Sequence, residues 1–134
     1  MIDPEFLDIE DVLLIHSRQL AKYGGAAGVR DQALLESALA MPMATFGGEF
    51  VHKDLFAMAA AYAFHIAENQ PFLDGNKRTG VLAAVVFLEL NGHVVEEPPS
   101  RLYEAMIAVA ERRLDKAGLA EMLRELSRPV AAQD

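Results

Sequence analysis

The chain has 134 residues, 52% of them hydrophobic, and its 12 Lys and Arg against 20 Asp and Glu give a formal net charge of −8. This length predicts one domain with a sizeable core, and the hydrophobic content is too high for a disordered chain. The acidic balance argues against nucleic acid as a partner, and the lack of Cys excludes disulfides and thiolate zinc sites.

The sequence indicates neither a membrane span nor export. No apolar run reaches the ~18 residues that a transmembrane helix needs. The first residues, 1–5, are acidic where a signal peptide would be basic. Together with the lack of Cys, these features lead us to expect a cytoplasmic protein.

The first predicted helix starts at Asp8. This residue is the expected N-cap, with Asp11 at the third helical position, and the glycine-rich stretch 24–28 ends the helix. His16 lies inside it, where a packed or surface position is a simpler interpretation than a ligand. The side chains that we expect on the buried face are Ile9, Val12, Leu13, Ile15, Leu20 and Tyr23.

A shorter helix and an irregular segment follow. Asp31 is the expected cap of this second helix, and Pro42 ends it. Between Pro42 and the next helix, Phe46 and Phe50 flank a Gly-Gly pair, which fits either a short hairpin or an open loop. If the segment is only a connection, the two Phe side chains would anchor it.

The two most apolar segments of the chain enclose a polar stretch. Residues 55–66 (LFAMAAAYAFHI) and 81–90 (VLAAVVFLEL) are apolar nearly all round, which predicts helices buried on every side. Between them, residues 69–80 contain Pro71 and other turn residues that interrupt the periodicity. We expect the second of these buried helices to begin near Asn76.

That polar stretch has the composition of an anion site. The start of a helix leaves backbone N–H groups unpaired at the positive end of the helix dipole. Gly75 lets the backbone approach a ligand, Lys77 and Arg78 add two cations, and Asp74 adds a carboxylate that could hold Mg²⁺. The alternative is a purely structural turn, which would need the same Gly, Asp and Asn.

The last third continues the helical pattern. Asn91 and Gly92 end the buried helix, residues 93–97 form an extended link, and Ser100 and Asp115 start two further helices. In the first of these two we expect an inward face made of Leu102, Met106, Ile107, Val109 and Ala110. In the second we expect one made of Leu119, Met122, Leu123 and Leu126.

These elements define the expected fold class. Apart from a possible hairpin, nothing requires a sheet, so the chain is predicted to be a single all-α domain of about six helices. The domain would cover residues 1–127, followed by a polar C-terminal tail over 128–134.

The polar stretch also resembles a known family. The segment PFLDGNKRTG, residues 71–80, is similar to the signature loop of the Fic/Doc (Fido) superfamily, which reads His-Pro-Phe-x-Asp/Glu-Gly-Asn-Gly/Lys-Arg. Lys77 in place of Gly is typical of the death-on-curing (Doc) branch, and residues 14–39 contain short segments similar to that branch. The resemblance spans most of residues 1–127 and implies a signature loop between two central buried helices, with the segment after the second helix as a flap.

The resemblance implies a role for each matching residue. Asp74 would help to hold Mg²⁺ that bridges the phosphates of ATP. Gly75, Asn76 and Lys77 would surround phosphate oxygens with backbone amides, and the Asn76 side chain would add a contact. Arg78 would stabilise charge on the transferring group. Phe72 would anchor the loop in the core.

One position departs from the family pattern. The leading His, which acts there as general base, is Gln70 here. An amide donates and accepts hydrogen bonds but does not titrate, so Gln70 could orient a hydroxyl without taking its proton. His65, five residues earlier, could replace the base, although its apolar neighbours favour a helix-packing role.

The implied function is that of a Doc-like toxin of a toxin–antitoxin pair. It would be an ATP- and Mg²⁺-dependent phosphotransferase that acts on a translation factor, elongation factor Tu by resemblance, and Gln70 would impair it. The nearest match to the family's inhibitory helix, Ser100-x-x-x-Glu104-Ala105, lacks the final residue, so an antitoxin in trans is the expected partner. A nucleotide- or antitoxin-binding module, an AMP transferase and a helical interaction protein without a nucleotide remain as alternatives.

Overall fold

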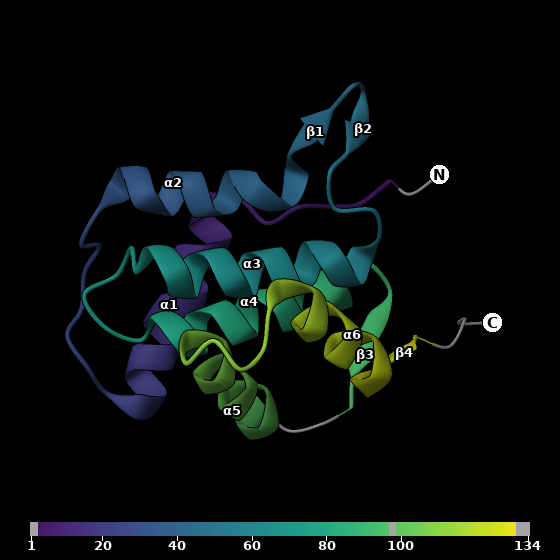
Figure 1. Ribbon diagram of the computed structural model, residues 1–134. Helices are drawn as coiled ribbons and strands as arrows, with labels where there is room; N and C mark the ends of the chain where they lie inside the picture. Colours follow the sequence, from purple (N-terminus) through teal and green to yellow (C-terminus); the bar gives the residue numbers. More distant parts are fainter. Residues whose placement is uncertain (1–2, 97–98, 131–134) are drawn as a thin grey trace.

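The computed structural model describes residues 3–96 and 99–130. Its elements are α1 (Ile9–Tyr23), α2 (Gln32–Ala40), the 3-10 helix η1 (Met41–Met43), β1 (Thr45–Phe46), β2 (Glu49–Phe50), α3 (Leu55–Asn69), α4 (Asn76–Leu90), β3 (His93–Val95), α5 (Pro99–Ala110), α6 (Lys116–Leu126) and β4 (Ser127–Pro129). The prediction of an all-α domain with about six helices is therefore confirmed, with the small sheets at its edge (Figure 1).

Three helices start at the caps expected from the sequence, Asp8, Asp31 and Asp115, and α3 has a cap, Asp54, that was not predicted. An Asp side chain accepts a backbone N–H of the first turn in α1, α2, α3 and α6. In α1 the arrangement is a full capping box, because Asp8 and Asp11 each accept the backbone N–H of the other at 2.9 Å. α4 begins near Asn76, as predicted, but without such a cap.

Helix α3 lies at the centre of the domain. It packs against α4, α6 and α2, and α1 packs on α4 (Figure 1). Its alanines leave room for neighbours to approach closely, and α4 does so at Gly80. A Cβ at Gly80 would lie 2.8 Å from the backbone oxygen of Ala63, closer than real Cβ contacts. The two apolar helices thus meet almost backbone to backbone and fix both ends of the loop between them.

Of the two alternatives for the segment after the second helix, a short hairpin or an open loop, the structure shows the hairpin. β1 and β2 pair antiparallel, with Phe46 opposite Glu49, and they project beyond α2 and α3 (Figure 1). Phe50 anchors the hairpin, since its ring centroid lies 5.8 Å from that of Phe6. Phe46 does not, because it is 85% exposed. Of the two Phe anchors that a mere connection would have, only Phe50 packs against the core.

A second sheet was missed. The link that we expected to be extended forms β3, and β4 pairs with it antiparallel, with Val94 opposite Arg128. Residues 127–129 therefore belong to the folded body, and the boundary expected after residue 127 falls inside β4. Each strand is too short to show an alternation of polar and apolar residues in the sequence, so the sequence did not predict that β3 and β4 pair.

Helix faces deviate from the expected pattern at two places. In α5, Ile107 and Ala110 are exposed, and Ala105 is buried instead. Ile107 lies five positions from the buried Leu102, which is about 140° around a helix. In α1, Leu13 and Tyr23 are exposed, and the polar residues His16 and Gln19 are buried in their place.

In the described part of the chain, no helix is both long and apolar enough to cross a membrane.

Candidate functional site at the start of α4

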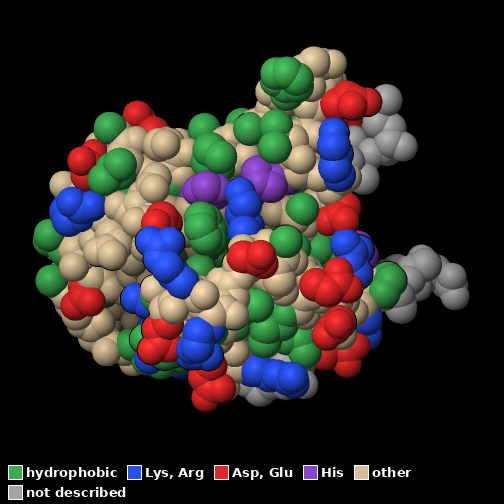
Figure 2. All heavy atoms as spheres, in the orientation of Figure 1, with side chains coloured by type: hydrophobic (Ala, Val, Ile, Leu, Met, Phe, Trp, Pro, Cys, Tyr) green, Lys and Arg blue, Asp and Glu red, His purple; other side chains and the backbone are tan. Residues whose placement is uncertain are grey.

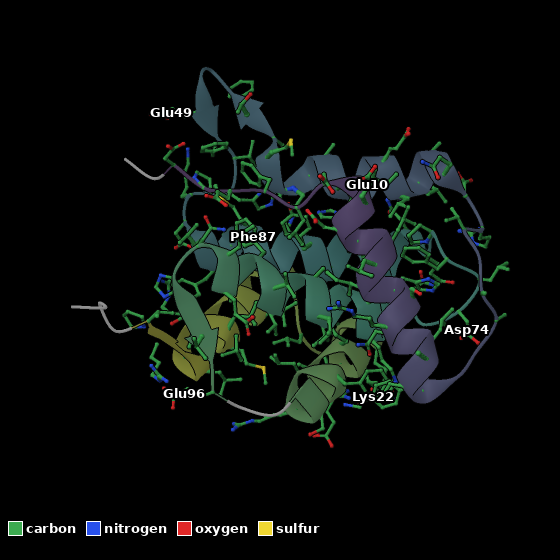
Figure 3. All side chains as sticks on the ribbon, turned by 180° about the vertical axis from the view of Figure 1, so that it is seen from behind. Glu10, Lys22, Glu49, Asp74, Phe87 and Glu96 are labelled. Atoms are coloured by element: carbon green, nitrogen blue, oxygen red, sulfur yellow. The ribbon has the colours of Figure 1, made fainter. Side chains whose placement is uncertain are left out.

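A hollow of about 510 Å³ opens where α4 begins. The residues named from the sequence as site candidates all line it: Gln70, Asp74, Gly75, Asn76, Lys77 and Arg78. α1 and the following glycines form the opposite wall, and Tyr103 of α5 closes one side. Figure 3 shows Asp74 beside the second half of α1. The fold therefore brings the whole polar stretch to one cavity.

The backbone at this helix start is free to bind an anion. The N-cap, Gly75, has a φ of 76° and no side chain to offer, unlike the Asp caps of the four helices named above. Among the described residues, no hydrogen bond reaches the backbone N–H groups of Asn76, Lys77 and Arg78. These N–H groups and the positive end of the dipole of α4 face the hollow.

Two cations stand beside these amides. Lys77 and Arg78 are half-buried, and no carboxylate in the described part of the chain pairs with either. The Arg78 guanidinium instead lies over two aromatic rings, with Cζ 3.9 Å from the Tyr23 centroid and 4.2 Å from that of Tyr103. In a protein with a net charge of −8, two cations without carboxylate partners are suited to an anionic ligand.

The loop is held in shape by Asn76 and Phe72. The Asn76 side chain accepts a hydrogen bond from the Phe72 N–H and donates one to the Phe72 carbonyl, both at 3.0 Å. The ring of Phe72 is only 1% exposed, as expected for an anchor. The Asn76 amide therefore shapes the loop while it lines the hollow, and its second side-chain N–H and its backbone N–H have no partner among the described residues.

His16 supports the same loop from α1. Its ring stacks on Phe72 with centroids 3.8 Å apart and an interplanar angle of 8°. Its Nε2 lies 2.8 Å from the carbonyl oxygen of Asp74, which requires the proton to be on Nε2 for a hydrogen bond. His16 is thus packed, as the sequence suggested, and it holds the backbone at the turn before α4.

The connection between α1 and α2 braces the other side of the loop. Val29 forms an isolated antiparallel bridge with Phe72, and the Pro71 carbonyl accepts N–H bonds from Arg30 and Asp31 at 2.7 and 3.1 Å. The Arg30 guanidinium donates to the carbonyl oxygen of Gln70 at 2.7 Å and to that of Asn69 at 3.0 Å. This one side chain therefore satisfies the last carbonyls of α3.

Asp74 is arranged so that its carboxylate can still bind a cation. Oδ1 accepts the N–H of Gly75 at 3.1 Å, and Oδ2 accepts the N–H of Ala26 at 3.3 Å. Each oxygen retains a lone pair, and the side chain is exposed to the hollow. Gly25 is required here, because a Cβ on it would lie 2.8 Å from Oδ2.

Gln70 lies at the edge of the hollow with an exposed side chain. It ends α3 in the left-handed conformation, with φ 48° and ψ 56°, and its N–H donates to the Ile66 carbonyl at 3.1 Å. This conformation is uncommon for a residue other than Gly, and the hydrogen bond from Arg30 helps to hold it. The position of the family's base is therefore presented to the cavity, but by an amide.

His65 is not placed to replace that base. It does not line the hollow, and its Nε2 lies 3.1 Å from Nζ of Lys116, on the face of α3 that α6 covers. Nε2 of His52 lies 3.2 Å from the same Nζ. Figure 2 shows His side chains next to a Lys or Arg side chain on one face of the molecule. Burial, then the charge of Lys116, lowers the pKa of His65 to about 4. The helix-packing interpretation of His65 fits these contacts.

Sequence reasoning named the loop but missed the residues that support it. Arg30 and His16 act through backbone oxygens, and no spacing rule links them to residues 70–74. Tyr23 and Tyr103 lie 80 positions apart in the chain, so their meeting at Arg78 depends on the packing of α1 and α5. The one feature of the sequence that could have indicated these supporting residues is the presence of the polar residues His16 and Gln19 on the otherwise apolar face of α1.

The chain belongs to the Fic/DOC family, whose model matches residues 6–88. It is 39% identical over 121 residues to Toxin Doc of Mycolicibacterium smegmatis, which covers 89% of this chain and 91% of that relative. It is 30% identical over 117 residues to Protein kinase doc of Escherichia phage P1, which covers 87% of this chain and 91% of that relative. The resemblance to the Doc branch is therefore confirmed.

Proposed function

We propose that this protein is a Doc-like toxin that binds ATP with Mg²⁺ in the hollow at α4 and transfers the γ-phosphate to a hydroxyl of a translation factor. The proposal is carried by the uncapped start of α4, with three free N–H groups, two cations without carboxylate partners and one carboxylate around one cavity. The names of the relatives, a toxin and a protein kinase, support it. Elongation factor Tu is the first target to test.

The residues fit a magnesium–nucleotide ligand. Mg²⁺ in nucleotide sites is commonly held by one or two carboxylates together with phosphate oxygens and water, and Asp74 supplies one carboxylate. The unpaired backbone N–H groups of Asn76 and Lys77, at the positive end of the dipole of α4, would donate to phosphate oxygens. The bound metal would neutralise phosphate charge. Arg78 would bind the transferring group with its planar donors, a geometry that ammonium lacks.

Lys77 favours phosphate transfer over transfer of a nucleotidyl group. Its side chain adds bulk and charge beside the helix start, where the wider family has Gly, and this restricts how deep a phosphate chain can lie. AMP transfer is the alternative outcome of the same assay. Both reactions use the same anion site, so they are distinguished by which part of ATP becomes attached to the target.

Gln70 favours a second candidate, a binding module that has lost turnover. No histidine lines the hollow within the described part of the chain, so the attacking hydroxyl has no imidazole base. The amide can orient that hydroxyl but cannot accept its proton. The transition-state groups Arg78 and Asp74 are present, and we therefore expect binding to survive and the rate to be low.

A partner in trans would restrain the activity. The sequence Ser100-x-x-x-Glu104-Ala105 lies on α5, and Glu104 is exposed there. We propose an antitoxin whose segment orders on binding and which brings basic residues to the acidic surface.

The test is to restore the base. Gln70→His should raise transfer of radiolabelled γ-phosphate from ATP to elongation factor Tu by about 10²–10⁴-fold, the usual contribution of general-base catalysis. The same comparison with α-labelled ATP detects AMP transfer. If the parent is already as fast as Gln70→His, another base operates and the assignment of position 70 is wrong. If both forms bind ATP and neither transfers anything, the binding-module candidate is correct.

A further inference from the structure

The guanidinium of Arg78 is held by aromatic faces. Its Cζ lies 3.9 Å from the ring centroid of Tyr23, at the end of α1, and 4.2 Å from that of Tyr103, in α5. We call these three residues the aromatic clamp. Cation–π contacts of this kind hold the flat face of a guanidinium by its charge, whereas the N–H donors lie in the plane of the group and remain free.

Arg124 shows the more common arrangement in the same protein. Its Cζ lies 4.8 Å from the Phe56 centroid, but its N–H donors bind carboxylates, that of Asp54 at 2.6 Å and that of Glu121 at 3.3 Å. Those donors are already used. In the part of the chain that the structure describes, Arg78 has no carboxylate partner, and its guanidinium contacts two rings.

The clamp stands between two hollows. Tyr23, Arg78 and Tyr103 line the 510 Å³ hollow at α4 and also a second hollow of about 290 Å³. Lys22 and Ser100 also line the second hollow. The Lys22 Nζ lies 5.3 Å from the centroid of the Tyr23 ring, which Arg78 contacts as well. The guanidinium is therefore accessible to a ligand in the hollow at α4.

We propose that Tyr23 and Tyr103 are positioning residues that pre-orient the Arg78 guanidinium towards the transferring phosphate. This inference rests on the proposed function. An arginine side chain that must be ordered on binding costs affinity, and one that is already ordered by rings does not. The rings order the guanidinium without occupying the N–H donors that the phosphate needs. A carboxylate partner would occupy those donors.

The first test measures the guanidinium itself and needs no nucleotide. In arginine side-chain ¹⁵N NMR, hindered rotation about Nε–Cζ separates the Nη signals, and the signals of Arg78 are assigned by their loss in Arg78→Lys. We expect hindered rotation in the parent, averaged signals in Tyr23→Leu/Tyr103→Leu, and recovery in Tyr23→Phe/Tyr103→Phe. Leu retains apolar bulk and Tyr23 is 49% exposed, so the Leu variant should fold, which its melting curve checks.

A matched control comes from the other arginine–ring pair. Phe56→Leu removes the ring under Arg124 and should change the Arg124 signals while leaving those of Arg78 as they are. If Arg78 rotates freely in the parent, or stays hindered after both rings are removed, the two rings do not hold it and the proposal is overturned.

The second test links the clamp to the ligand. Calorimetric titration with Mg²⁺–ATP should show affinity reduced by roughly 2- to 12-fold in the Leu variant, the fold-change that corresponds to ordering one flexible side chain. The Phe variant should regain the lost affinity. Unchanged affinity in the Leu variant would contradict the positioning role. If the parent itself binds no Mg²⁺–ATP, the proposed function fails, and the NMR result still decides whether the rings hold Arg78.

Discussion

At the scale of single residues, Phe72 connects the loop to the core. Its ring is 1% exposed and is stacked on His16, while its backbone is bonded to Asn76. Phe72→Ala should lower the free energy of unfolding by about 3–5 kcal/mol, because it removes a buried ring and leaves a cavity that rigid helices cannot close. Urea unfolding followed by circular dichroism measures this change.

The matched comparison for that prediction is Phe46→Ala, which truncates a ring that is 85% exposed. This variant should stay within about 0.5 kcal/mol of the parent. Equal stabilities for Phe72→Ala and the parent would mean that the ring does not anchor the loop.

For single residues, the sequence predicted the members of the site well and the contacts that support them poorly. It predicted the loop residues Asp74 to Arg78 as one site because their chemistry is contiguous in the chain. It did not predict that His16 would lie flat on Phe72, since stacking across 56 positions depends on how α1 crosses α4. Nor did it assign the Asn76 amide to the loop, because an amide beside a helix start fits a ligand equally well.

At the scale of elements, the contact between α3 and α4 depends on Gly80. A Cβ there would lie 2.8 Å from the Ala63 carbonyl oxygen, which is backbone and cannot rotate away. Gly80→Ala should therefore destabilise the protein by roughly 1–3 kcal/mol, the cost of overpacking, although Ala is the better helix former by about 1 kcal/mol. Thermal unfolding monitored at 222 nm provides the measurement.

Glu89→Ala, on an exposed position of the same helix, is the control for that substitution. It also introduces Ala into α4 but adds nothing to the interface with α3. A Gly80→Ala variant that is as stable as the parent, or more stable, would show that the helices can separate without cost.

The junction of α3 with α6 should make stability depend on pH. The pKa of His65 is lowered by burial and by Lys116 and His52 to about 4, against 6.5 in the unfolded chain. Between these values the unfolded chain binds a proton that the folded chain does not, so stability falls as the pH drops from about 6.5 to 4. Solvent screening of this partly exposed cluster limits the loss to about 1–2 kcal/mol.

The comparison that isolates this effect uses His65→Gln. Urea midpoints of parent and variant at pH 7.5 and pH 5.0 should show a smaller loss in the variant, since Gln does not titrate. Asp54 also has a lowered pKa, but it titrates at more acidic pH and is common to both proteins. The same pH dependence in both proteins would rule out His65 as its source.

The element scale shows why helices could be predicted and small strands could not. The predicted Asp caps are local signals that placed α1, α2 and α6 close to their observed starts. The apolar runs and the turn residues between them did the same for α3 and α4. The pairing of β3 with β4 joins residues 93–95 to 127–129, which no local pattern records. The bridge of Val29 to Phe72, which braces the site, was missed for the same reason.

At the scale of the whole molecule, the fold concentrates free positive charge in an acidic protein. The net charge is −8, and several described arginines pair with carboxylates or backbone oxygens, as Arg124 and Arg30 do. Arg78 and Lys77 have no such partner within the described residues, and both lie at the start of α4. Unlike α1, α2, α3 and α6, this helix has no side-chain cap. The molecule is thus organised around an anion site that its own surface does not neutralise.

The central claim, that this site binds the phosphates of a nucleotide, is tested most directly by calorimetric titration of the parent and Arg78→Ala with Mg²⁺–ATP. We predict that the parent binds and that Arg78→Ala loses about 1.5–3 kcal/mol of binding free energy, the value of a charge-assisted hydrogen bond. Arg128→Ala, which removes the same charge from a surface pair with Glu96, should bind as the parent does. Equal affinities for the parent and Arg78→Ala, or no binding by the parent, would contradict the claim.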